Sequence, residues 1–148
     1  MRIVMNAARF LSRTGRDLRQ GALSREPMEL LRFGWKEDEV ECDWLIRPAD
    51  RWDIDLPSHV SKENQTLQAL KDALSLRDLI FESFPEVKNA NLRMFRADAD
   101  RRLELMMTGS VSRSNEVFER VASVAMRAKL CGFKFTLDEG VLEGPVSI

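Results

Sequence analysis

A long apolar stripe between Ser61 and Pro85 constrains the fold of this chain more than any other feature. Apolar side chains recur there at intervals of three and four residues, which is the spacing of one face of an α-helix. Ser61 is a suitable N-cap and Pro85 cannot continue a helix, so the pattern predicts one helix that ends before Pro85. The stripe consists of Leu67, Leu70, Ala73, Leu74, Ile80, Phe81 and Phe84. A helix with so broad an apolar face needs a sheet or another helix to cover it.

Segments on both sides of this helix alternate between apolar and polar residues, which is typical of β-strands. Residues 31–35 and 40–46 flank the polar turn 36–39, and residues 92–95 and 103–107 flank the polar turn 98–101. A second helix is predicted to start at Ser112 or Ser114 and to end before Gly132, which suits the left-handed C-cap conformation. A last strand is predicted from Phe133 to near Gly140, followed by a short irregular tail.

From residue 40 onward the predicted order is β-α-β-β-α-β, and an extra strand is predicted before it. Right-handed crossovers and a tight central hairpin arrange this order as an α+β, ferredoxin-like two-layer sandwich with both helices on one face of the sheet. The side chains predicted to face the helices are Val40, Cys42, Trp44, Ile46, Leu92, Met94, Leu103, Leu105, Met107, Phe133 and Phe135.

Charge divides the chain into a basic leader and a mildly acidic domain. Residues 1–27 contain six arginines against Asp17 and Glu26, a net charge of +4, whereas the whole chain carries −1. The leader has a weak amphipathic pattern and ends at Pro27, so we expect a basic leader or docking helix over 1–27 and one α+β domain over 28–148. Contact of this basic segment with a membrane surface or with nucleic acid is an alternative, less favoured than a docking role.

Composition argues against several classes of protein. Cys42 and Cys131 are widely separated and are predicted to be free, buried thiols of a reducing compartment. His59 is the only histidine, so a tetrahedral zinc site cannot be assembled. No apolar run approaches the roughly 20 residues of a membrane helix, and no nucleotide-binding or nucleophile motif is present. We therefore expect a soluble, cytoplasmic protein without a cofactor, and enzymatic activity is not favoured.

The face of the sheet opposite the helices is the first candidate for function. Strand periodicity places apolar Leu45, Phe95 and Met106 there, with Arg47, Arg93 and Glu104 around them. An apolar patch with a polar rim commonly marks an interaction site. We therefore predict a non-enzymatic module that associates with itself or with another protein through this face. Base stacking is disfavoured, because the third core strand has no aromatic residue and Glu41 and Asp43 would repel phosphate.

A polar loop provides the alternative hypothesis. Arg47, Asp50, Arg51, Asp53 and His59 together offer oxygen ligands, cations and a base, which suits a small-molecule or metal-dependent enzyme. The spacing lacks the glycine and the terminal glutamate of an EF-hand loop. Aspartates in turns commonly bond to backbone N–H groups, so a structural role is favoured here.

One segment has a family resemblance. Residues 103–133, with Gly109, Val111 and Glu116 ahead of a helix and Gly132-Phe133 after it, resemble the second half of a BON domain. That family is associated with phospholipid-facing envelope roles. The resemblance covers about a fifth of the chain and its helical interval is longer than in the family, so no function is carried over from it.

Overall fold

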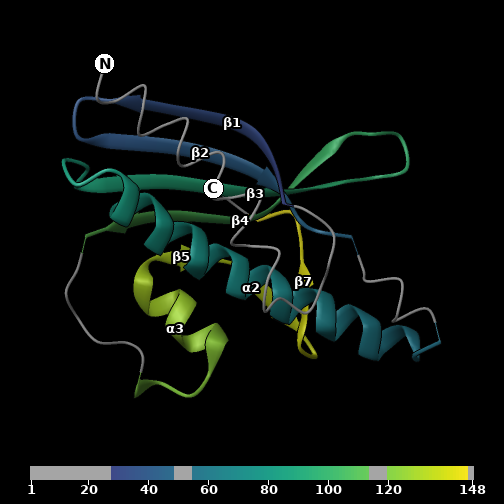
Figure 1. Ribbon diagram of the computed structural model, residues 1–148. Helices are drawn as coiled ribbons and strands as arrows, with labels where there is room; N and C mark the ends of the chain where they lie inside the picture. Colours follow the sequence, from purple (N-terminus) through teal and green to yellow (C-terminus); the bar gives the residue numbers. More distant parts are fainter. Residues whose placement is uncertain (1–27, 49–54, 114–119, 147–148) are drawn as a thin grey trace.

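The computed structural model describes residues 28–48, 55–113 and 120–146, and the predicted leader lies outside them. The described chain is an α+β structure (Figure 1). Its elements are β1 (Glu29–Lys36), β2 (Glu39–Leu45), α2 (Ser58–Ser83), β3 (Asn89–Ala97), β4 (Leu103–Ser112), α3 (Val124–Cys131), β5 (Phe133–Lys134), β6 (Thr136–Asp138) and β7 (Val141–Glu143). Within this part, β1 to β5 form one mixed sheet in sequence order, and β6 and β7 form a separate hairpin.

The connection through α2 decides the topology, and it corrects the ferredoxin-like prediction. Strands β2 and β3 are direct, parallel neighbours, whereas the other neighbouring pairs of the sheet are antiparallel. A split β-α-β unit would place another strand between them. Here α2 is the crossover of an ordinary β-α-β unit, and β4 and β5 extend the sheet beyond β3. The order of elements in the sequence is compatible with either arrangement, because it does not specify which strands pair.

Helix α2 packs across one face of the sheet, and α3 lies beside α2 and next to β5 (Figure 1). The strands contribute Trp44, Leu92, Met94 and Met107 to this core, and all four side chains are at most 1% exposed. Helix α2 contributes Leu76 and Ile80, which are fully buried. The predicted helix-facing positions on β2 and β3 are therefore confirmed.

Both helices begin elsewhere than the sequence predicts. Helix α2 starts at Ser58 after Pro57, so Ser61 lies within the helix and donates its N–H to the Pro57 carbonyl at 3.1 Å. Helix α3 starts only after Ser123, whose hydroxyl accepts from the N–H of Met126 at 3.2 Å. Ser112 is instead the last residue of β4, and Ser114 lies outside the described residues.

The end of α2 is fixed by a cation that is distant in sequence. The Arg113 guanidinium donates to the carbonyl oxygens of Phe81, Phe84 and Val87 at 2.8, 2.8 and 2.9 Å. It also lies over the Phe81 ring, 4.8 Å from the centroid. Positive charge at a helix C-terminus offsets the partial negative charge of its unpaired carbonyl groups. Arg113 thereby attaches the end of β4 to the end of α2.

The chain after α3 is less regular than one strand. Gly132 adopts the left-handed conformation with φ of 111°, as predicted for the C-cap. Phe133 joins the main sheet in β5, but Leu137 belongs to the β6–β7 hairpin, which contacts α2. Among the described residues, no helix is both long and apolar enough to cross a bilayer.

Candidate functional site

The face of the sheet opposite α2, here called the open face, carries no helix in the described part of the chain (Figure 1). Its centre is a polar row that crosses all five strands in register. Each strand from β1 to β5 contributes one member, namely Arg32, Asp43, Arg93, Thr108 and Lys134. Directly opposed side chains in neighbouring strands lie within contact distance, so this row is a continuous polar band.

Asp43 is the centre of this band. Arg93 donates to it twice, with Nε 3.0 Å from Oδ1 and Nη2 2.7 Å from Oδ2. Arg32 Nε lies 3.6 Å from the same Oδ2 and also pairs with Glu41. Hydrogen bonding to Asp43 raises the pKa of Arg93 above its ordinary value. The two arginines cover Asp43, which is only 6% exposed although it lies on the open face.

A shallow depression of about 510 Å³ lies over this band. Its described lining combines the two arginines and two carboxylates with Asn91, Thr108, Gly109 and Ser110. The lining therefore carries as many positive as negative side chains. Such a surface suits a polar, uncharged or charge-balanced partner better than a polyanion.

An apolar row lies directly beside the polar band. Leu45, Phe95 and Leu105 stand opposite one another on β2, β3 and β4, and each is partly exposed. The Arg93 guanidinium lies over the Phe95 ring, 5.3 Å from its centroid. Leu45, Phe95 and Leu105 are called the apolar row below.

The predictions for Leu103, Leu105 and Met106 are wrong because β4 contains a β-bulge. Met94 pairs with Met107 and Phe95 pairs with Leu105, so Met106 is an extra residue in the ladder. The bulge reverses the alternation on the N-terminal side of Met107. Met106 is consequently fully buried, whereas Leu103, which was expected in the core, is 54% exposed. Leu105 takes the place beside Phe95 that the sequence assigns to Met106.

The predicted rim also changes. Arg47 is not on the open face, because its side chain is 1% exposed and its Nε lies 2.8 Å from Asp72 Oδ2 of α2. Strand β2 ends at Leu45, so strand periodicity no longer applies at residue 47. Glu104 pairs with Arg96 at 2.8 Å near the β3–β4 turn. Of the predicted rim residues, Arg93 lies over the Phe95 ring of the apolar row.

Of the alternative ligand loop, Arg47 and His59 lie in the described part of the chain. Arg47 is buried against Asp72, whereas the His59 side chain is 52% exposed and pairs with Glu63 on the first turns of α2. Asp50, Arg51 and Asp53 lie outside the described residues. Within the described ranges, no three histidine, cysteine or acidic side chains are grouped so that they could hold a metal ion.

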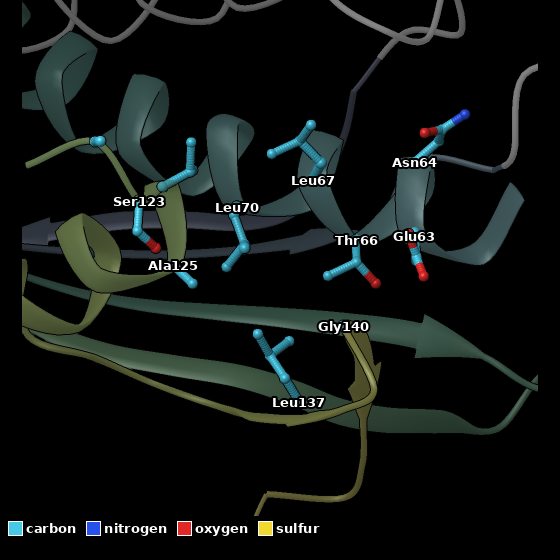
Figure 2. A pocket seen from close by; sticks show the side chains of 11 residues that line it. Glu63, Asn64, Thr66, Leu67, Leu70, Ser123, Ala125, Leu137 and Gly140 are labelled. Atoms are coloured by element: carbon cyan, nitrogen blue, oxygen red, sulfur yellow. The ribbon is translucent and has the colours of Figure 1, made fainter. Parts of the chain in front are cut away.

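A second pocket was not anticipated from the sequence. It has a volume of about 440 Å³ and lies between α2, the start of α3 and the β6–β7 hairpin (Figure 2). Leu70 of α2 and Leu137 of the hairpin point toward each other across it, and Glu63 points toward Gly140. The stripe on α2 identified Leu67 and Leu70 as apolar, but nothing local indicated that the hairpin would leave a space beside them.

The two cysteines were also considered as candidate nucleophiles. Both thiols are free, Cys42 buried and Cys131 partly exposed. Burial, with a smaller contribution from Asp43, raises the pKa of Cys42 to about 12. Burial also raises the pKa of Cys131. A raised pKa disfavours the nucleophilic thiolate, so neither thiol has the character of a catalytic cysteine.

Comparison with known proteins gives no further constraint. No protein-family model, no curated protein and no solved structure matches this chain. The functional interpretation therefore depends on the geometry alone.

Proposed function

We propose that this protein is a non-enzymatic interaction module that self-associates through the open face of its sheet. The observation that carries the proposal is the apolar row of Leu45, Phe95 and Leu105, which lies in register beside Arg93. Partly exposed apolar side chains that adjoin a polar band are typical of interaction sites.

The arrangement of Arg93 supports a binding role. Its guanidinium donates two hydrogen bonds to Asp43 and lies over the Phe95 ring, and these contacts hold it in place. A side chain that is already ordered loses less conformational entropy when a partner binds. Arginine and aromatic residues also dominate the binding energy of many interfaces. Arg93 is 42% exposed, so part of it remains accessible to a partner.

Charge balance favours a second copy as the partner. Two copies related by a twofold axis bring the same surface together, so a strongly charged face would repel itself. Here Arg32 and Arg93 are balanced by Glu41 and Asp43, and Lys134 leaves the polar band with Glu41 at a net charge of only +1. A net charge this small opposes self-association only weakly.

The dimensions of the face set the expected affinity. Strands β1 to β4 are 7 to 10 residues long and lie about 4.8 Å apart, and β5 has only two residues, so the flat area of the face is roughly 400–500 Å². This is below the roughly 800 Å² per partner of a standard interface, which places the contact in the weak class. We therefore expect a dissociation constant in the micromolar range, on the order of 1–100 μM.

Light scattering coupled to size-exclusion chromatography, over loading concentrations from about 1 μM to about 1 mM, tests the proposal. Wild type should shift from monomer to dimer, and Phe95→Glu should remain a monomer, because a charge would be buried in the interface. Leu130→Glu is the matched control, since Leu130 is 47% exposed on α3 and away from the open face.

Phe95→Ser, with circular dichroism of each variant, separates loss of dimer from loss of fold. A wild-type chain that is monomeric throughout the concentration range contradicts self-association. So does a folded Phe95→Glu variant that dimerises as wild type does.

A further inference from the structure

We infer that the pocket between α2, α3 and the β6–β7 hairpin is a binding site for a small amphipathic amine, with an aliphatic body and one positively charged head. This inference goes beyond the proposed self-association, which uses the other face of the sheet. The pocket volume of about 440 Å³ lies within the range of roughly 300–1,000 Å³ that is usual for small-molecule sites.

Most of the described residues that line the pocket are aliphatic, and Asn64, Thr66 and Ser123 add polar groups. Leu67 and Leu70 come from α2, Val124 and Ala125 from the first turn of α3, and Leu137 from β6. Figure 2 shows Leu70 and Leu137 on opposite sides of the space. Three separate elements thus contribute apolar walls, which suits an alkyl chain better than a polar ligand.

The pocket is held in shape before any ligand binds. The backbone N–H of Leu142 donates to Thr66 Oγ1 at 2.9 Å, and both residues are buried. This bond attaches β7 to α2 at Thr66, which lines the pocket. A preformed apolar site avoids the ordering cost that a flexible site incurs on binding.

The rim selects the charge of the ligand. Glu63 is the only charged side chain among the described residues that line the pocket, and no described lining residue is a cation. Its side chain is 47% exposed, pairs with His59 and lies near Gly140 (Figure 2). A carboxylate beside an aliphatic pocket attracts an ammonium group and repels a carboxylate, and an ammonium group bound there would share Glu63 with His59.

Titration of the full-length protein with n-hexylamine and n-octylamine, followed by two-dimensional amide NMR, tests this inference. The amide signals of residues around Leu70 and Leu137 should shift as amine is added, and the shifts should reach a plateau when the site is saturated. Each added CH₂ should tighten binding by about threefold to fourfold, as expected for burial of one methylene. Octanoate should bind at least about tenfold more weakly than octylamine, because Glu63 repels it.

Two variants locate the site. Ala125→Trp fills the pocket and should weaken octylamine at least about tenfold, while Ala99→Trp, in the exposed β3–β4 turn, should leave binding unchanged. Glu63→Gln, at an exposed position, should weaken binding of octylamine but not of octanol. Octanoate binding as tightly as octylamine would overturn the inference. Saturable shifts that are absent, or that persist in the folded Ala125→Trp variant, would overturn it as well.

Discussion

The buried ion pair of Arg47 and Asp72 connects the chain just after β2 to α2, and its contribution to stability can be measured. Their side chains are 1% and 5% exposed and meet at 2.8 Å, and Gln68 also donates to Asp72 at 2.8 Å. Removing one partner of such a pair leaves a buried charge uncompensated, which costs about 3–5 kcal/mol. Arg47→Met and Asp72→Asn should each lower the unfolding free energy by about this amount, a large part of the roughly 5–15 kcal/mol typical of a domain.

The double variant distinguishes loss of the pair from loss of packing. Asn at position 72 retains a side-chain oxygen for Gln68, so Arg47→Met combined with Asp72→Asn removes both charges but leaves that acceptor in place. Its cost should be smaller than the sum of the two single costs by at least about 2 kcal/mol, because neither charge is then left alone.

The pH dependence follows from Asp72. Burial raises the pKa of Asp72 to about 6, although Arg47 and Gln68 lower it in part. An aspartate carboxyl in the unfolded chain has a pKa of about 3.9. Between about pH 4 and pH 6 the folded protein therefore retains a proton on Asp72 that the unfolded chain has lost. The free energy of unfolding consequently falls as the pH rises through that window. Loss of Arg47 raises the pKa further. Arg47→Met should therefore cost less at about pH 5, where Asp72 is neutral, than at about pH 8.

Urea unfolding followed by tryptophan fluorescence measures these differences, with Trp44, 1% exposed, as the buried reporter. Single variants that cost less than about 1 kcal/mol each would refute a buried, mutually dependent pair. A cost of Arg47→Met that is the same at both pH values would refute the assigned role of Asp72.

Two further predictions concern the core and the thiols. Gly109→Ala should lower the free energy of urea unfolding by about 1–3 kcal/mol, because a Cβ there would lie 2.5 Å from the Phe133 ring. Gly34→Ala is the control and should be neutral or stabilising, because a Cβ there would have no atom within 4 Å. Equal effects of the two substitutions would exclude the ring contact as the cause. With Ellman's reagent, Cys131 should react in the folded protein, slowly because its pKa is raised, and Cys42 only after unfolding. Fast modification of both thiols in the folded protein would contradict the observed burial.

The sequence by itself determined the elements whose signal is local. The apolar stripe on α2 and the alternation on β2 and β3 each record burial on one side of a regular element, and Trp44, Leu92 and Met94 are buried as predicted. The hairpin turn before β2 and the left-handed Gly132 were also predicted correctly, because turns and caps depend on a few adjacent residues.

Only the tertiary structure decided the features that depend on partners distant in the chain. The local sequence pattern predicts strands but does not indicate which strands pair, so it could not predict that β2 pairs with β3. The bulge at Met106 adds one residue to a ladder, and a period of two then places every earlier side chain of β4 on the other face. Arg47 is buried because Asp72, on a helix 25 residues away, supplies a counter-charge. The candidate surfaces depend in part on these long-range contacts: the sequence located the open face with Leu45, Phe95 and Arg93 on it, but it did not predict that Leu105 would replace Met106 there.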